Sequence, residues 1–205
     1  MEQRTDDWFT ARLGKVTASK IADVMATTKT GASASRKNYM AQLLTERLTG
    51  QKADSYSNAA MQWGVDTEPQ ARAMYELETG RDVVEVGFID HPVIAMSGAS
   101  PDGLVGEAGL VEIKCPNTAT HIETLRGAAI DKKYVLQTQW QMACTGRQWC
   151  DFVSFDPRLP SAMQLYVARV ERDATLIAAM ESEVASFLAE INKAEEELRA
   201  KYMEN

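Results

Sequence analysis

Apolar residues in the first 80 positions recur at the three- to four-residue spacing of amphipathic helices. This spacing predicts helices over residues 8–13, 20–25, 37–49 and 59–79. Gly14, Gly50 and Gly80 follow three of these segments and can end them. Pro69 lies inside the last segment, so that helix is expected either to kink there or to restart with Pro69 in its first turn. Residues 27–36 are small, polar and weakly basic, and predict a mobile loop.

After residue 81 the pattern changes to short apolar runs separated by His-Pro, Pro-Asp-Gly and Glu-Ala-Gly turns. These runs predict strands over residues 82–89, 94–98, 103–105 and 110–114. The rest of the chain predicts helices over 118–125 and 134–144, a hairpin of 149–155 with 164–170, and a long amphipathic helix from Asp173. The highly charged last turns of that helix are expected to project into solvent. This order predicts an α/β fold in which helices flank a mixed central β-sheet, in a single domain spanning residues 1–205.

Composition narrows the class of protein. No apolar run approaches the roughly 20 residues that cross a bilayer, and the polar N-terminus carries no signal-peptide pattern, so a cytoplasmic location is expected. The cysteines, Cys115, Cys144 and Cys150, are too few for an iron–sulfur cluster and are predicted to be reduced thiols. His91 and His121 are not spaced for zinc. A net charge of −7 argues against a generally basic nucleic-acid binder, but a local basic groove could still exist.

One short segment carries candidate chemistry. Asp102 lies in a Ser-Pro-Asp-Gly turn, ten residues before Glu112, and the run Glu-Ile-Lys-Cys-Pro places Lys114 two residues after Glu112. Residues two apart in a strand share a face, so Glu112 and Lys114 are expected to project together, with Ile113 on the opposite side. Carboxylates are ligands that Mg²⁺ prefers, and a nearby lysine can orient or deprotonate a water molecule. The pattern is typical of metal-assisted phosphodiester hydrolysis. The alternative is a turn aspartate with solvent-facing strand residues.

Further motifs occur in a fixed order along the chain. They are Trp8-x-x-x-Arg12-Leu13-Gly14, Thr17-Ala18-Ser19, Trp63-Gly64-x-x-x-Glu68, Ser100-Pro101-Asp102-Gly103-Leu104, Glu112-Ile113-Lys114-Cys115-Pro116, Tyr134-x-x-Gln137-x-Gln139, Asp156-Pro157-Arg158 and Glu171-Arg172-Asp173. In this ordered set the chain resembles the bacteriophage lambda exonuclease family, the YqaJ-type viral recombinases with a restriction-endonuclease-like PD-(D/E)xK core.

The resemblance implies a Mg²⁺-dependent exonuclease, with Mn²⁺ as a substitute metal. Such an enzyme degrades one strand of double-stranded DNA from a 5′-phosphorylated end and leaves 3′ single strands for recombination by strand annealing. It also implies a ring-shaped homotrimer and a single-strand annealing protein as partner. No association with membranes is expected, because the sequence has no apolar run long enough to cross one.

The resemblance further assigns roles to residues. Asp102, Glu112 and the backbone carbonyl of Ile113 would be metal ligands, and Lys114 would position the attacking water. Glu68 matches an additional acidic residue near the metal, although a lone helix glutamate is usually solvated and the neighbouring Pro69 departs from the family pattern.

A second group of matched residues would cradle the 5′-phosphate: Arg12, Ser19, Ser100 and Gln137. An arginine that can fork onto a phosphate, hydroxyl donors and an amide donor suit that task. The alternatives are helix capping for Ser19, a turn contact for Ser100, and exposed polar positions for the other two.

The remaining matches concern DNA. Met61 falls where the family places an apolar wedge, Trp8 where an aromatic ring can meet a base, and Tyr134 beside the same site, although core packing is an alternative for all three. Lys29, with Arg36 and Lys37, could grip the duplex backbone. A family arginine after the Lys-Cys-Pro run is replaced here by Thr120.

Two rival functions remain open at this level. The same fold and metals could serve a structure-specific endonuclease that cuts internally. The chain could also be a DNA-end-binding or recombination-scaffold protein without catalysis, although binding alone does not require Asp102, Glu112 and Lys114 together.

Overall fold

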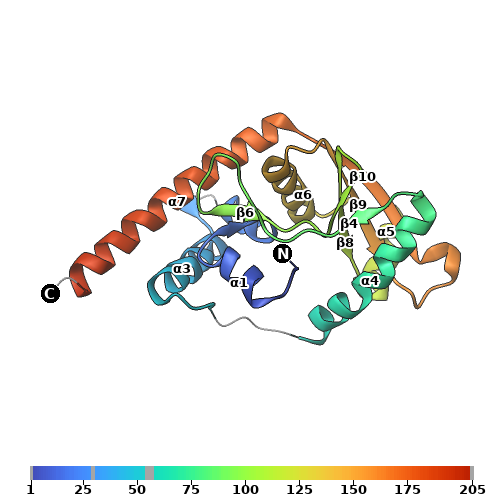
Figure 1. The fold of residues 1–205 in the computed structure, drawn as a ribbon, viewed down its shortest axis with the longest axis horizontal. Helices are drawn as coiled ribbons and strands as arrows, with labels where there is room; N and C mark the ends of the chain where they lie inside the picture. The colour runs from blue at the N-terminus through green and yellow to red at the C-terminus, as the bar shows by residue number, and fades with distance from the viewer. Residues whose placement is uncertain (1, 29–30, 54–57, 204–205) are drawn as a thin grey trace.

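The computed structural model describes residues 2–28, 31–53 and 58–203 (Figure 1). Its α-helices are α1 Asp6–Arg12, α2 Ile21–Val24, α3 Ala34–Thr49, α4 Ala59–Thr79, α5 Thr118–Leu125, α6 Lys132–Thr145 and α7 Ala174–Tyr202, with short 3₁₀ turns at Ala18–Lys20 and Ser161–Met163. Its strands are β1 Val16–Thr17, β2 Thr27–Thr28, β3 Gly31–Ala32, β4 Val83–Val84, β5 Ile89–Asp90, β6 Ser97–Ala99, β7 Gly103–Val105, β8 Gly109–Lys114, β9 Trp149–Phe155 and β10 Leu165–Glu171. Among the described helices, none is long and apolar enough to cross a membrane.

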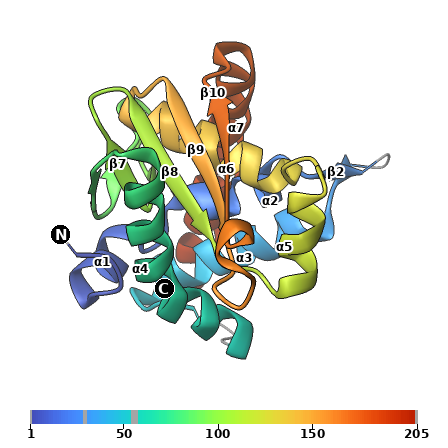
Figure 2. The ribbon, with the colours of Figure 1, turned by 90° about the vertical axis from the view of Figure 1, so that its right-hand side faces the viewer.

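The main sheet is mixed, as the sequence predicts. Its strand order is β10-β9-β8-β7-β4, with β8 and β9 parallel and the other neighbours antiparallel. A smaller sheet, β1-β6-β5, lies beside it, and β2 pairs with β3 in a separate hairpin. Helix α4 crosses one face of the main sheet in front of β8 (Figure 2). The fold is therefore the mixed α/β arrangement expected from the order of elements.

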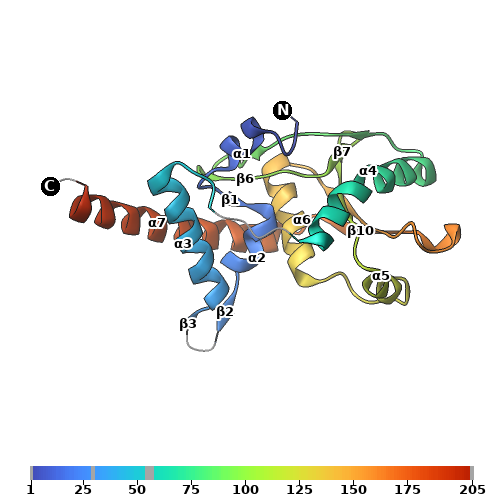
Figure 3. The same ribbon diagram turned by 90° about the horizontal axis from the view of Figure 1, so that it is seen from below.

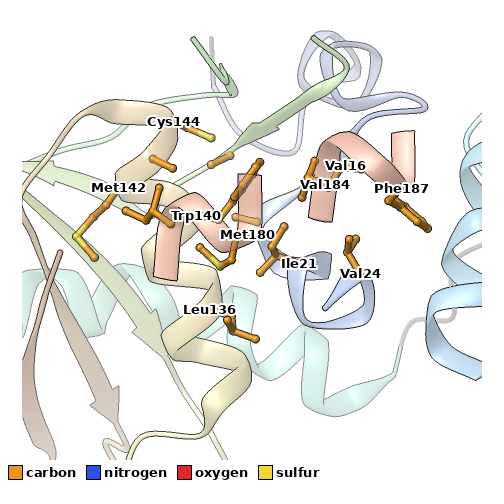
Figure 4. Close-up of a cluster of buried hydrophobic side chains, with 14 of the residues drawn as sticks. Val16, Ile21, Val24, Leu136, Trp140, Met142, Cys144, Met180, Val184 and Phe187 are labelled. Atoms are coloured by element: carbon orange, nitrogen blue, oxygen red, sulfur yellow. The ribbon is translucent and has the colours of Figure 1, made fainter. Parts of the chain in front are cut away.

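Two apolar clusters hold these layers together. The larger joins α2, α3, α6 and α7 around Trp140, Met180 and Phe187, which are fully buried (Figure 4). The smaller packs Ala71 and Tyr75 of α4 against the sheet. Strand β8 contributes to both clusters, because alternate residues of a strand face opposite sides: Leu110 joins the larger cluster, and Val111 and Ile113 the smaller. Glu112 shares the Leu110 face, which α6 covers.

The predicted strand over residues 82–89 is wrong in extent. Its ends form two separate short strands, since β4 pairs with β7 in the main sheet and β5 pairs with β6 in the smaller one. The predicted strand over 94–98 is limited to Ser97–Ala99. Before it, the His91 Nδ1 accepts the backbone N–H groups of Val93 and Ile94, so the chain turns there instead of pairing.

The predicted loop over residues 27–36 is also wrong in part. It contains the β2–β3 hairpin, which projects from the body (Figure 3), and α3 begins at Ala34 because the Ser33 hydroxyl caps it by accepting the Arg36 N–H. Arg36 is buried and ion-paired with Glu183 and Glu190 of α7. Its guanidinium therefore joins α3 to α7.

The two longest helices, α4 and α7, are both continuous. Helix α4 runs unbroken through Pro69, so it does not restart there. Helix α7 packs its first turns through residues such as Ile177, Val184 and Ile191, whereas its last turns extend beyond the body (Figure 1). In these last turns the described apolar residues Leu198 and Tyr202 are exposed. The expectation that the charged end of this helix projects into solvent is confirmed.

Candidate active site

One hollow of about 510 Å³ brings the predicted site residues together. It opens beside α1, the start of α4, the end of β8 and the start of α6. Its lining includes every residue that the sequence assigns to the metal, the 5′-phosphate or the bases, whereas Arg36 and Lys37 do not line it and Lys29 lies outside the described residues. The predicted residues that line it are Trp8, Arg12, Ser19, Met61, Glu68, Ser100, Asp102, Glu112, Ile113, Lys114, Tyr134 and Gln137.

Strand β8 places Glu112 and Lys114 on the same face. The Glu112 carboxylate is almost fully buried, with 1% of the residue exposed, and it accepts the Lys114 ammonium at 2.5 Å. It also accepts the side-chain amides of Gln137 and Gln141, each at 2.6 Å. These donors hold both carboxylate oxygens in fixed directions. Gln141 was not predicted from the sequence, although its spacing of four residues from Gln137 puts both amides on one face of α6.

Asp102 stands just before β7, where the pairing with β8 begins. Its Oδ2 accepts the backbone N–H of Ile113 at 2.7 Å, which anchors the carboxylate beside the end of β8. The next residue must be a glycine, because a Cβ at Gly103 would lie 2.1 Å from Cγ1 of Val83. The Pro-Asp-Gly turn thus allows β4, β7 and β8 to approach closely around Asp102.

The charges in this part of the hollow do not balance. Burial raises the pKa of Asp102 well above its ordinary value, and the negative charges of Glu112 and Glu68 raise it further. Burial alone would lower the pKa of Lys114, but Glu112 and Asp102 outweigh it and raise that pKa, so the ammonium stays protonated. Two carboxylates therefore share one cation, and a further cation would relieve their repulsion.

The donor set at this point fits a hard divalent cation. Carboxylate oxygens of Asp102 and Glu112 and the carbonyl oxygen of Ile113 are all oxygen ligands of the kind Mg²⁺ takes. Among the described residues, no three His, Cys, Asp or Glu side chains converge as a metal cluster, and a set of two carboxylates and a carbonyl does not require that. Cys115 is unsuited to metal or nucleophilic chemistry, because burial raises the pKa of its thiol to about 12.

Glu68 faces the same hollow but is held by arginines. Its Oε1 accepts Arg72 at 3.0 Å and its Oε2 accepts Arg4 at 2.5 Å. Neither arginine was found from the sequence. Arg72 follows Glu68 by four residues on α4, a spacing that favours an ion pair, whereas nothing in the sequence links Glu68 to Arg4. In this arrangement Glu68 is a neighbour of the carboxylate pair and forms no hydrogen bond to Asp102 or Glu112.

Arg12 and Ser100 form the other end of the hollow. The Ser100 hydroxyl accepts the Arg12 guanidinium at 3.0 Å and the Trp8 indole N–H at 2.9 Å, and Arg12 lies over the Trp8 ring at 4.1 Å. Burial lowers the pKa of Arg12 to about 10, which still leaves it charged at neutral pH. Ser19 lines the same end. Gln137 instead donates to Glu112, so of the predicted phosphate group it lies nearest the carboxylates.

Helix α3 holds the turn that follows Arg12. Gly14 has a φ of +67°, a conformation that favours glycine. Its N–H donates to Glu46 and its carbonyl accepts Arg47, both at 2.9 Å. A Cβ there would lie 2.7 Å from Cγ of Arg47. Glu46 and Arg47, which sequence reasoning missed, therefore fix the segment between Arg12 and Ser19.

Met61 and Tyr134 differ in exposure, since Met61 is exposed and Tyr134 is half-buried. Met61 is 54% exposed, so it is not a core residue, and Val65 lies one turn further along the same face of α4. Tyr134 packs its ring 5.5 Å from the Phe152 ring while Lys114 lies 5.0 Å from its centroid. Tyr134 therefore supports the lysine as well as the core.

The Asp-Pro-Arg motif braces the segment after β8. Arg158 binds the buried Asp156, donates to the carbonyl of Pro116 and lies 4.4 Å from the centroid of the Trp63 ring. Asp156 also accepts the Thr118 hydroxyl at 2.6 Å. These contacts join α4, the turn after Lys114 and the start of α5 at one point.

The fold and the ordered motifs together place the chain in the class of viral recombinase nucleases. The family model described as the YqaJ-like viral recombinase domain matches residues 7–148, and the chain belongs to this family.

Solved structures agree with this assignment. The chain is similar to LHK-Exo, an alkaline exonuclease from Laribacter hongkongensis, in its complex with dAMP: identity is 60%, the match covers 96% of this chain and 97% of that one, and the TM-score is 0.90. A phage-related exonuclease from Haemophilus somnus 129PT shares 18% identity over 90% of this chain and 96% of its own, with a TM-score of 0.74, a likeness in fold. No curated protein matches the chain.

Proposed function

We propose that this protein is a Mg²⁺-dependent 5′→3′ exonuclease of double-stranded DNA. It would resect linear ends and leave 3′ single strands for phage-type recombination by strand annealing. The family and LHK-Exo support a role as a DNA exonuclease. The observation that carries the proposal is the single hollow in which the Asp102–Glu112–Lys114 cluster lies next to the Arg12–Ser100 pair.

The cluster suits hydrolysis of a phosphodiester. Bound Mg²⁺, held by Asp102, Glu112 and the carbonyl of Ile113, would polarise the scissile phosphate and make water a better nucleophile. Lys114 would orient that water and stabilise the charge that develops on the phosphate oxygens. The Gln137 and Gln141 amides would keep Glu112 aimed at the site.

The direction of degradation would follow from the Arg12–Ser100 end. A half-buried guanidinium with adjacent hydroxyls favours a phosphate dianion over a bridging phosphodiester. A strand whose terminal 5′-phosphate binds there would present an internal phosphodiester to the carboxylates. Trp8 and Met61 would contact the unpaired bases at that end.

The wider setting is proposed from the family. It comprises a homotrimeric ring around the DNA, delivery of the 3′ strand to a single-strand annealing protein, and a cytoplasmic location. Mn²⁺ is expected to substitute for Mg²⁺ because it accepts similar oxygen ligands.

The test compares linear duplex DNA bearing 5′-phosphates with a closed circle of the same sequence, in Mg²⁺ or in EDTA. We expect loss of the linear DNA only, only with Mg²⁺, and none with Asp102→Ala. Cutting of the closed circle would favour the endonuclease, and binding of ends without degradation in Mg²⁺ would favour the scaffold. A duplex with a 5′-hydroxyl on one strand and a 5′-phosphate on the other tests polarity, since the phosphorylated strand should disappear first.

A further inference from the structure

A second hollow of about 330 Å³ adjoins the first. The two share Trp8, Arg12, Ser19 and Met61, but the described lining of the second includes neither Asp102 nor any residue of β8. The second hollow therefore adjoins the arginine end of the first and is separate from the carboxylates. Its volume is at the small end of the range of about 300–1,000 Å³ for ligand pockets, which suits a ligand of one nucleotide.

The lining of the second hollow is basic. Besides Arg12 it contains Lys15, Lys20 and Lys52. Lys15 and Lys20 are paired with Asp90 and Asp23, ion pairs near the surface that hold their lysines weakly. Among the described residues Lys52 forms no ion pair, and its ammonium lies 4.0 Å from the centroid of the Phe9 ring.

The lining of the second hollow holds four cations against one carboxylate among the described residues. Glu46 is the carboxylate found there among the described residues, and it accepts the Gly14 N–H and the Gln42 amide. Tyr39 is buried, and its hydroxyl is hydrogen-bonded to the backbone of Thr17 and Lys15. Tyr39 therefore lines the hollow with no polar group left for a ligand. The surplus of positive charge over the second hollow therefore remains available to an anion.

Aromatic rings accompany these cations. Phe9 lies edge-on to Trp8 with their centroids 5.0 Å apart, and both rings line the second hollow. Cations that follow a phosphate backbone, together with rings on which bases stack, are the combination by which proteins bind unpaired nucleotides without a sequence code.

We propose that the second hollow is a subsite for one additional nucleotide on the 5′ side of the phosphate held at Arg12. This inference rests on the proposed function. A blunt end would seat its terminal phosphate at Arg12, because each further step requires unpairing bases at a cost of about 1.4 kcal/mol of stacking. An unpaired 5′ extension avoids that cost, so it would thread one nucleotide further, with its terminal phosphate near Lys52.

The reaction at the carboxylates would be unchanged. Water attacks the phosphorus, the bond from phosphorus to the 3′-oxygen breaks, and the new strand end keeps a 5′-phosphate. The released piece carries a 3′-hydroxyl, and it is a dinucleotide in place of a mononucleotide.

The test uses two duplexes that carry a radioactive 5′-phosphate, one blunt and one with a two-nucleotide 5′ overhang. The first labelled products are separated by length after brief digestion in Mg²⁺. We expect mononucleotides from the blunt end and mainly dinucleotides from the overhang. Lys52→Ala should lower the ratio of dinucleotide to mononucleotide from the overhang about threefold, and Lys20→Ala should lower it less. Lys193→Ala, an exposed lysine on α7, is the matched control and should leave the ratio unchanged.

The outcomes separate the two proposals. Mononucleotides alone from both duplexes, or a ratio that Lys52→Ala leaves unchanged, would overturn the subsite while the exonuclease stands. Absence of any labelled product from the blunt duplex would overturn the exonuclease and the subsite together.

Discussion

The carboxylate end and the arginine end of the active-site hollow are built in different ways. At the carboxylate end, Glu112 and Lys114 are neighbours on β8, the central strand of the main sheet, and Asp102 is ten residues away. At the arginine end, Arg12 meets Ser100 across 88 positions of the chain. The proposed chemistry would thus rest on one local segment of a sheet, whereas binding of the DNA end would depend on tertiary contacts.

The supports of the two ends differ as well. Glu112 is held by Gln137 and Gln141 of α6, a helix that the larger cluster fixes through Leu136 and Trp140. The segment after Arg12 is held from α3 by Glu46 and Arg47 through the backbone of Gly14. Substitutions at the carboxylate end should therefore remove the reaction itself, and those at the arginine end should change which DNA ends are used.

The largest expected effect is that of Asp102→Asn. The side chain keeps its size and can still accept the Ile113 N–H, but it loses the charge that would bind the metal. We expect the rate of degradation of linear DNA to fall by about a thousandfold or more. Because the buried carboxylate is repelled by Glu112, the variant should unfold at the same or a higher temperature without Mg²⁺. Retained activity, or a clear loss of thermal stability, would contradict this account.

Arg12→Gln should have a smaller and more selective effect. A charge-assisted hydrogen bond to phosphate contributes about 1.5–3 kcal/mol, so the preference for 5′-phosphorylated over 5′-hydroxyl ends should fall about ten- to a hundredfold. The measurement is the ratio of initial rates on the two ends at limiting DNA. Equal slowing on both ends would show that Arg12 supports the fold or the chemistry and does not recognise the phosphate.

Gln141→Leu should test how Glu112 is held. Loss of a hydrogen bond to a ligating carboxylate typically weakens metal affinity about ten- to a hundredfold, and we expect the lower value because Gln137 and Lys114 remain. The Mg²⁺ concentration for half-maximal degradation should rise about tenfold, with the rate at saturating Mg²⁺ reduced less. Gln139→Leu should leave this Mg²⁺ concentration unchanged, since the Gln139 amide binds the backbone of Glu171 and Asp173 and not Glu112. An unchanged Mg²⁺ requirement would remove Gln141 from the site.

The sequence predicts the carboxylate end better than the arginine end for a physical reason. Alternation along a strand places Glu112 and Lys114 together from their spacing alone, and the face of β8 is as predicted. Arg4, Arg72, Glu46 and Arg47 make contacts that no local pattern encodes, apart from the helical spacing of Arg72 and Glu68.

The errors in secondary structure have similar causes. The segment 82–89 is apolar enough for one strand, but its ends pair with strands of two different sheets. Arg36 lies in a stretch that looks like a basic loop, and only its ion pairs with α7 show that it is structural. In both cases tertiary pairing overrides a local pattern.

The smallest expected effect concerns the ion pair of Asp156 and Arg158, which braces the turn after Lys114. Hydrogen bonds from Arg158 and Thr118 lower the pKa of Asp156 from its ordinary 3.8 to about 2. The folded state therefore gains stability from ionised Asp156 above about pH 4, and this gain is lost as the pH falls toward about 2. Asp156→Asn lacks that ionisation and should be less stable at pH 7 by about 2 kcal/mol. Urea unfolding at pH 7, 4 and 3 should show a gap between the two proteins that is constant down to pH 4 and narrower at pH 3. A gap of constant size would mean that the Asp156 charge is not what joins the end of β9 to the turn after Lys114.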